Sequence, residues 1–352
     1  MKETDYAEIV TPLLAWYGEH ARELPWRETA DPYRIWVSEI MLQQTRVEAV
    51  KGYYERFISA LPDVGALAHC PEEKLLKLWE GLGYYSRVKN LQKAAQNIMD
   101  EWGGKLPADH EALLKLPGIG PYTAAAIASI AFGIPRAVVD GNVLRVCTRL
   151  TANDTDITDP AFRRQIAASL DDVIPKDAPG TFNQAMMDLG AVICTPNGTP
   201  QCALCPLRDL CKAHQAGEEL SYPVRSKGKA RKIEKMTVFL LRDSDRYAIR
   251  KRKEPGLLSG FYELPHTAGW LDEEAAVIYL MTIPVDPMHI SRIEDAKHIF
   301  THKEWHMIAY EVRIAAGSGE QCPDLVFASA KELKQTYPLP SAFAVYKKHI
   351  GL

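Results

Sequence analysis

Four cysteines lie close together after the middle of the chain and could bind a metal. The spacing C-x7-C-x2-C-x5-C joins Cys194, Cys202, Cys205 and Cys211. In a reducing compartment, four thiolates this close can hold Zn²⁺ or a [4Fe–4S] cluster, and the spacing alone leaves both open. The total of seven cysteines is odd and does not suit a disulfide framework. We expect the other three to be ordinary thiols, namely Cys70, Cys147 and Cys322.

Two carboxylates have surroundings in which acid–base chemistry is possible. Glu39 lies inside the apolar stretch 34–50. Its side chain is either solvated on an outer helix face or held in a partly buried pocket with a raised pKa. Asp140 stands in Val139-Asp140-Gly141-Asn142, which follows a glycine-rich turn. An acidic residue after such a turn favours a functional site over a purely structural corner.

The glycine-rich turn is Leu116-Pro117-Gly118-Ile119-Gly120. We expect it to close one helix, with Gly118 and Gly120 in backbone conformations that a Cβ would forbid. Pro121 then suits the first turn of the next helix, since its missing N–H costs nothing there. Backbone N–H groups at such a helix start can bind an anion such as a DNA phosphate. The alternative is a helix–helix corner without a ligand.

A second turn, WEGLGYYSR at 79–87, combines two glycines and two tyrosines with a cation. Exposed aromatic side chains beside Arg87 would suit insertion into a base stack and contact with the adjacent phosphates. The alternative is a buried tyrosine pair at a turn between helices. The polar run Gln43-Gln44-Thr45 could likewise contact bases or sugars, or be an ordinary exposed helix end.

Length and composition limit the class of protein. With 352 residues the chain is too long for one ordinary core, so we expect two domains. No apolar run has membrane-spanning length, and the N-terminus lacks the pattern of a signal peptide. We therefore expect a cytosolic protein with no membrane partner. The net charge of −3 and the pI of about 6.4 confine any phosphate-binding surface to a local patch.

Hydrophobic periodicity predicts a helical first domain and an α+β second domain. Helical patterns cover 5–20, 34–50, most of 50–115 and 151–192. From Met236 the pattern changes to strands at 237–241, 247–249, 260–265, 296–302 and 305–314, with helices near 272–281 and 330–336. A basic linker is predicted between the domains, and its charges either lie along DNA or are simply solvated. The predicted boundaries are 1–215, 216–235 and 236–352.

Several motifs, taken together, resemble a known superfamily. In order they are LPWR, SEIMLQQT, GLGYYSR, LPGIGPYTA, VDGN, FNQAMMDLG, the four cysteines and FTH. The first domain resembles the helix-hairpin-helix DNA glycosylase superfamily, which includes endonuclease III. The whole chain resembles adenine DNA glycosylases of the MutY type. The resemblance implies a mainly α catalytic domain with an iron–sulfur loop at 194–211, and an α+β Nudix-like C-terminal domain that recognises 8-oxoguanine.

The resemblance implies base excision repair, in which adenine opposite 8-oxoguanine or guanine is flipped out and its N-glycosidic bond is hydrolysed. Glu39 matches the catalytic acid, and Asp140 matches the carboxylate that faces the sugar. Asn142 would help to keep Asp140 ionised. Tyr122 stands where bifunctional relatives carry a lysine nucleophile. Without an amine there a Schiff base does not form readily, so a monofunctional glycosylase is expected.

The resemblance also implies residues that contact DNA. Gln44 and Tyr84 match residues that wedge into the duplex, and the loop Phe300-Thr301-His302 matches the one that reads 8-oxoguanine. Four residues fall in motifs that line the adenine pocket: Trp26, Arg27, Leu42 and Asp188. We also expect DNA or substrate contacts from Thr45, Leu82, Gly118 and Gly120.

The implied cofactor is one [4Fe–4S] cluster per chain, held by the four cysteines. The implied partner is double-stranded DNA with A:8-oxoG or A:G mispairs, bound by a monomer in a bacterial-type cytoplasm, at the nucleoid. Cluster and duplex are both implied by the resemblance; composition and spacing do not decide them.

Some features depart from the usual pattern of the family. Seven residues separate the first two cysteines instead of six, and a loop can absorb one residue. Thr301 stands where serine is common, and Asp188 stands where glutamate is frequent. The acidic Nudix helix, R-E-x-x-E-E, is missing, so the second domain is not expected to hydrolyse nucleotides.

Two other functions are compatible with parts of the pattern. A relative of the same superfamily could excise oxidised pyrimidines or mismatched thymine, although Tyr122 and the second domain argue against this. A non-catalytic sensor of DNA damage or redox state could use the metal site and the recognition domain. The presence of both Glu39 and Asp140 argues against the sensor.

Overall fold

The computed structural model describes residues 6–226, 230–253 and 256–352. They form two compact units: Met1–His69 with Lys89–Lys227, and Cys70–Val88 with Gly228–Leu352. The predicted linker 216–235 differs from this division, because 216–226 join the first unit and residues 227–229 lie outside the described residues. The second unit also contains 70–88. Long-range packing decides this membership, and the local sequence pattern does not reveal it.

The first unit is built from helices. In chain order they are α1 (Ala7–His20), η1 (Pro25–Arg27), α2 (Pro32–Leu42), α3 (Val47–Ala60), α4 (Val64–Ala68), α6 (Ser86–Trp102, which begins in the second unit), α7 (His110–Leu114), α8 (Pro121–Phe132), α9 (Gly141–Thr151), α10 (Pro160–Asp171), α11 (Pro179–Asp188), η2 (Leu189–Ile193), η3 (Cys202–Leu204), η4 (Arg208–Leu210), α12 (Lys212–Ala216) and η5 (Glu219–Ser221).

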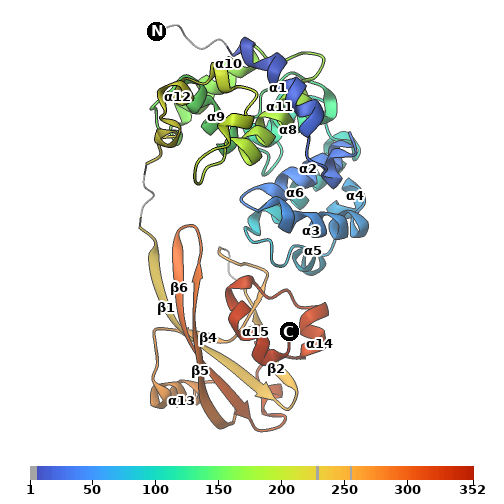
Figure 1. Cartoon of the computed structure of the whole chain (residues 1–352). Helices are drawn as coiled ribbons and strands as arrows, with labels where there is room; N and C mark the ends of the chain where they lie inside the picture. The colour runs from blue at the N-terminus through green and yellow to red at the C-terminus, as the bar shows by residue number, and fades with distance from the viewer. Residues whose placement is uncertain (1–5, 227–229, 254–255) are drawn as a thin grey trace. The chain divides into compact units, whose positions relative to one another are not determined.

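Caps and prolines set where the central helices begin. The Asp31 carboxylate accepts a hydrogen bond from the Tyr33 N–H at the start of α2, and Pro121 opens α8 as predicted. Helix α8 packs against α2 and α11, and α11 also contacts α1 and α9 (Figure 1). Fully buried side chains such as Trp36 and Phe182 contribute to the core of this unit. Helices α2, α8, α9 and α11 therefore form one packed group.

One predicted helix and one predicted turn of the first unit differ in detail from expectation. The predicted helix 34–50 is interrupted, since α2 ends at Leu42 and α3 begins at Val47. Gly118 has φ +77°, and a Cβ there would lie 2.7 Å from the Asn90 Cβ, so glycine is required. The same expectation for Gly120 was wrong. Gly120 has φ −92° and ψ 179°, because it is the extended N-cap residue of α8, and nothing lies within 4 Å of an added Cβ.

The second unit is α+β, as predicted. Its strands are β1 (Lys232–Asp243), β2 (Arg246–Lys251), β3 (Tyr262–Glu263), β4 (His266–Ala268), β5 (Pro287–Ile299), β6 (Lys303–Ile314) and β7 (Val326–Ser329). Its helices are α5 (Glu72–Leu78), α13 (Glu273–Leu280), η6 (Ser318–Gln321), α14 (Ala330–Gln335), η7 (Ser341–Phe343) and α15 (Ala344–Ile350).

One mixed sheet organises the second unit. The strand order is β3-β2-β1-β6-β5, while β4 pairs with β1 and β7 pairs with β2. The long strands β1 and β6 run parallel, and β5 is antiparallel to β6 (Figure 1). Buried apolar residues on β1 and β6, such as Phe239 and Val312, form a core with Leu280 of α13. The turn between β5 and β6 contains Phe300-Thr301-His302.

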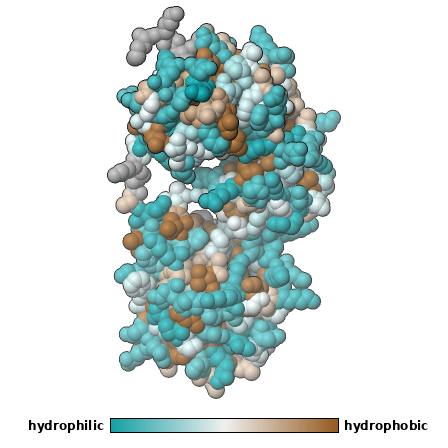
Figure 2. Space-filling model, in the orientation of Figure 1, coloured by the Kyte–Doolittle hydropathy of each residue, from teal (hydrophilic) through white to brown (hydrophobic). Residues whose placement is uncertain are grey.

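The surface is mainly polar. Most residues visible on the face shown in Figure 2 are hydrophilic, and apolar residues occur there in small groups. Among the described residues, no helix is both long enough and apolar enough to cross a membrane.

Candidate active site

A small cavity in the first unit, of about 50 Å³, is lined by Glu39. Helix α2 contributes Glu39 and Leu42 to its wall, and η1 contributes Trp26 and Arg27. Tyr122 lines it from the first turn of α8. Helix α11 adds Gln184 and Met187. Three stretches that are distant in sequence (η1 with α2, α8, and α11) thus meet around one carboxylate.

Glu39 is buried and hydrogen-bonded. Only 5% of the surface of Glu39 is exposed to solvent. The Tyr122 hydroxyl donates a hydrogen bond of 2.6 Å to Glu39 Oε2. Burial raises the pKa of Glu39 to about 6, against the opposing effect of the hydrogen bond from Tyr122. The charge of Asp140 raises this pKa further, and that of Arg27 lowers it. The alternative of a solvated Glu39 is therefore excluded, and this carboxyl group can hold a proton near neutral pH.

Asp140 has a different environment at the N-terminus of α9. It is the N-cap residue, and its carboxylate accepts 2.8 Å hydrogen bonds from the Val143 N–H and from Asn142 Nδ2. Burial raises the pKa of Asp140, while these hydrogen bonds act to lower it. Both donors and the helix N-terminus favour the charged form.

Arg145 links the Asp140 region to the first cysteine. Its Nη2 donates to Asn142 Oδ1 over 2.9 Å and to the Gly190 carbonyl over 2.8 Å. Its Nε donates to the Cys194 carbonyl over 2.8 Å. The orientation of Asn142 is therefore fixed from both ends, by Asp140 and by Arg145.

Asp188 lies at the end of α11 and binds two arginines. Its side chain is fully buried, and its carboxylate accepts from Arg27 Nη1 over 2.7 Å and from Arg22 Nε over 2.8 Å. Burial alone would raise the pKa of Asp188, but hydrogen bonds from Arg27 and Arg22 outweigh it and lower that pKa. Asp188 thus positions Arg27 in the wall of the cavity, and it is not among the residues that line the cavity.

The four cysteines line one small cavity of about 30 Å³, also in the first unit. Cys202 Sγ lies within 4.8 Å of ligand atoms of His214 and Glu219. Arg149 Nη1 donates to Cys194 Sγ over 3.2 Å, and the Cys211 thiol lies 3.4 Å from the Arg149 carbonyl. Four free thiols around one cavity, with a cation beside them, are a suitable donor set for a metal centre with anionic ligands.

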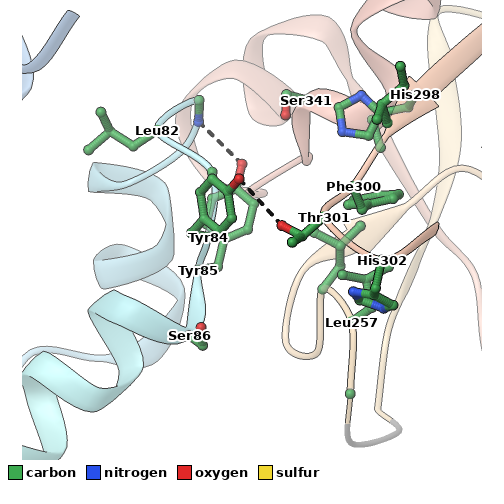
Figure 3. Close-up of a pocket in the computed structure, with 16 residues that line it drawn as sticks. Leu82, Tyr84, Tyr85, Ser86, Leu257, His298, Phe300, Thr301, His302 and Ser341 are labelled. Carbon is green, nitrogen blue, oxygen red and sulfur yellow. Dashed lines mark hydrogen bonds between the residues drawn. The ribbon is translucent and has the colours of Figure 1, made fainter. Parts of the chain in front are cut away.

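The second unit contains a larger cavity of about 490 Å³. Its wall includes Leu82, Tyr84 and the loop Phe300-Thr301-His302 (Figure 3). The Thr301 hydroxyl donates to the Tyr84 hydroxyl over 3.4 Å, which joins the glycine turn to the loop. Tyr84 is 46% exposed, whereas Tyr85 is buried. The turn is therefore neither the fully exposed nor the fully buried tyrosine pair that the sequence allowed.

Backbone strain marks the two residues expected to enter the duplex. Gln44 has φ +58° and Tyr84 has φ +49°, a region that non-glycine residues rarely adopt. Both residues are exposed and occupy tight turns. Strain of this kind collects at functional sites, where the surrounding structure holds it.

The structure brings together some of the site residues that were expected from the sequence. Glu39, Tyr122, Trp26, Arg27 and Leu42 line one cavity, whereas Leu82, Tyr84 and 300–302 line another. Gln184 and Met187 line the first cavity but were not singled out from the sequence. The motif FNQAMMDLG could have indicated them, because it contains both residues together with Asp188.

Comparisons with known proteins match two families, one after the other along the chain. Residues 37–171 match the family described as HhH-GPD superfamily base excision DNA repair protein, and residues 237–348 match the NUDIX domain family. A solved structure of a thermostable thymine-DNA glycosylase is 30% identical, with a TM-score of 0.54. The match covers 59% of this chain and 96% of that chain.

Curated relatives match over longer stretches. The adenine DNA glycosylase of Homo sapiens is 43% identical over an alignment of 227 residues. The match covers 61% of this chain but only 41% of the human protein. The adenine DNA glycosylase of Buchnera aphidicola subsp. Schizaphis graminum is 32% identical over 310 residues. That match covers 86% of this chain and 87% of the Buchnera protein. The chain thus spans less than half of the human relative and most of the Buchnera relative.

Proposed function

Because this chain belongs to the family of adenine DNA glycosylases, we propose that it removes adenine from mispairs with 8-oxoguanine or guanine in double-stranded DNA. The reaction is hydrolysis of the N-glycosidic bond, as part of base excision repair. The adenine must leave the base stack to reach a buried acid, at a cost of a few kcal/mol. Gln44 in the first unit and Tyr84 in the second are exposed residues with positive φ, and each is proposed to insert into the duplex.

Glu39 is proposed as the general acid. A pKa of about 6 leaves a usable protonated fraction near neutral pH, and a proton delivered to adenine N7 makes the base a better leaving group. Trp26, Arg27 and Leu42 of the same cavity are proposed to contact the base. Asp188 acts through Arg27 in this proposal and does not touch the base itself.

Asp140 is proposed to stabilise the positive charge that develops on the sugar. Its carboxylate receives hydrogen bonds from Val143 and Asn142, which favour the ionised form. Two carboxyl groups in different environments, one able to hold a proton and one hydrogen-bonded as an anion, are the pattern of glycoside hydrolysis.

The reaction is proposed to stop at the abasic site. Tyr122 occupies the first turn of α8, where its hydroxyl is engaged with Glu39. Burial raises the pKa of Tyr122 well above its usual range, so its hydroxyl remains protonated and donates to Glu39. A phenol cannot form a Schiff base with the sugar, which supports a monofunctional enzyme.

Recognition of 8-oxoguanine is proposed for the second unit. The 490 Å³ cavity beside Tyr84 offers the Thr301 hydroxyl, the Phe300 ring and His302 at one rim (Figure 3). Apolar walls with a few convergent polar groups suit a planar base. The first unit is proposed to contact phosphates through Gly118 and Gly120, and bases or sugars through Thr45. The DNA is proposed to bind to a monomer.

The four cysteines are proposed to hold one [4Fe–4S] cluster. When bound, the cluster supplies a covalent crosslink of the 194–211 segment and a one-electron redox couple. Arg149 and Arg145 connect this segment to α9 by hydrogen bonds to Cys194. Through these bonds the segment is proposed to stabilise α9, the helix whose N-cap is Asp140.

The single observation that carries the proposal is the buried Glu39 bonded to Tyr122 in a cavity of the first unit. The test is Glu39→Gln, which keeps the size of the side chain and removes the proton donor. We expect binding to an A:8-oxoG duplex, measured by gel shift, to be retained and adenine release to be lost. Adenine release at the wild-type rate would overturn the assignment of Glu39.

A further inference from the structure

The glycine turn that bears Tyr84 is held by an extensive set of contacts inside the second unit. It follows α5, and residues 70–88 all belong to that unit, although they lie within the stretch that matches the HhH-GPD family. The turn needs support from its surroundings, because the non-glycine residue Tyr84 has φ +49°. What supports the turn therefore decides where Tyr84 stands.

Some of this support is local. Trp79 Nε1 donates to the Gly83 carbonyl over 3.2 Å, and the Arg87 guanidinium donates to the carbonyls of Leu82 and Gly83 over 3.3 and 3.0 Å. The Gly81 N–H donates to the Tyr85 hydroxyl over 3.4 Å (Figure 3). These bonds fix the shape of the turn but not its position against the 300–302 loop.

The position is fixed by Glu80 and two lysines. The Glu80 carboxylate pairs with Lys77 and with Lys347 of α15, each over 2.6 Å, and its side chain is 15% exposed. Lys77 Nζ also donates to the carbonyls of Leu333 and Tyr337 over 3.0 and 3.2 Å. Glu80 is thus the anion that joins α5, the turn and the C-terminal helix.

Two flanking contacts keep α5 and the turn on the sheet. Glu73 accepts from Lys251 of β2 over 2.7 Å and from the Tyr262 hydroxyl over 3.1 Å. The Tyr85 ring packs against the fully buried Phe261, with ring centroids 4.1 Å apart. Their removal would loosen α5 and the following turn, whereas loss of Glu80 would release the turn itself.

We propose that Glu80 is a positioning residue for lesion recognition: by bridging Lys77 and Lys347 it holds Tyr84 in register with Thr301, so that discrimination between 8-oxoguanine and guanine opposite adenine depends on it. The proposal rests on the proposed function. It adds that Tyr84 and the reading loop form one preassembled element, which a partly buried ion pair maintains. Removing one partner of such a pair leaves the other charges unbalanced and shifts the groups that they hold.

The test compares single-turnover adenine release from A:8-oxoG and A:G duplexes. The proteins are the wild type, Glu80→Gln, Lys347→Gln and the double variant. Glu72→Gln is the control, because Glu72 is an exposed carboxylate at the start of α5, the helix that precedes the turn. We expect each single variant to lower the rate ratio between the two duplexes by about tenfold, in line with the coupling energies of contacting charged groups. The double variant should show no further loss beyond that of Glu80→Gln, because the Glu80 change already breaks the ion pair with Lys347.

Each outcome has a defined meaning. If the ratio of the rates on the two duplexes is unchanged in Glu80→Gln, the proposal is overturned. This holds also when both rates fall by the same factor, because such a loss indicates a general structural effect. Additive losses in the double variant would show that the two residues act separately, which also contradicts it. Lys347→Gln keeps the test decisive if Glu80→Gln does not fold. Failure of the wild type to release adenine from either duplex would instead refute the proposed function.

Discussion

Glu39→Gln should make the protein more stable at neutral pH while it removes activity. The folded-state pKa of Glu39 is raised from 4.5 to about 6 by burial. Between these two values the folded state binds more protons than the unfolded state, so the contribution of Glu39 to stability falls as the pH rises. The rise of this pKa from 4.5 to about 6 corresponds to a penalty of about 2 kcal/mol once the pH exceeds both values. Glutamine stays neutral and can still accept the Tyr122 hydrogen bond, so it avoids this penalty.

The assay is urea unfolding of wild type and Glu39→Gln at pH 4.5 and pH 7.5. The difference between the two proteins in the free energy of unfolding should change by about 2 kcal/mol between these pH values, in favour of the variant at pH 7.5. Other titrating groups cancel in this comparison, and Glu55→Gln on an exposed position of α3 is the control. A difference that is the same at both pH values would refute the raised pKa and, with it, the argument for Glu39 as an acid.

The other predictions concern the same unit. Because only protonated Glu39 acts, the single-turnover rate of the wild type should fall about tenfold per pH unit above about 7, and a flat profile would contradict this. Tyr122→Phe removes a hydrogen bond that lowers the Glu39 pKa, so the alkaline limb of the same profile should move to higher pH; movement to lower pH would be inconsistent with it. Asp188→Asn leaves Arg22 and Arg27 without their buried anion and should cost about 3–5 kcal/mol in urea unfolding, so a cost below about 1 kcal/mol would argue against this role. Cys205→Ser should abolish the brown colour and the band near ~400 nm of the purified protein, and a colourless wild type would favour zinc instead.

Local sequence signals predicted the elements well where one residue type has one physical consequence. Pro121 opens α8, Gly118 needs its positive φ, and the change of periodicity at Met236 marks the sheet. The superfamily inferred from the ordered motifs is confirmed by the family matches to both units. Gly120 shows the limit of the same reasoning, because a glycine that merely caps a helix in an extended conformation has the same local signature as one that requires positive φ.

Long-range relationships could not be predicted from local pattern. Nothing near Asp188 in the sequence indicates that Arg22 and Arg27 bind it, since the partners are more than 160 residues away. In the same way, 70–88 has the periodicity of its helical neighbours but packs with the C-terminal sheet, through Glu73, Glu80 and Tyr85. Whether Glu39 is buried or solvated could not be predicted for the same reason, because burial depends on the elements that pack around it.

The most direct test of the central claim is single-turnover release of adenine by the wild type from a duplex with adenine opposite 8-oxoguanine, beside duplexes with A:G and with thymine opposite guanine. We expect fast release of adenine opposite 8-oxoguanine, slower release opposite guanine, and no release of thymine. The resulting abasic strand should break only after alkali. Release of thymine but not adenine would contradict the account, and so would tight binding without release of any base.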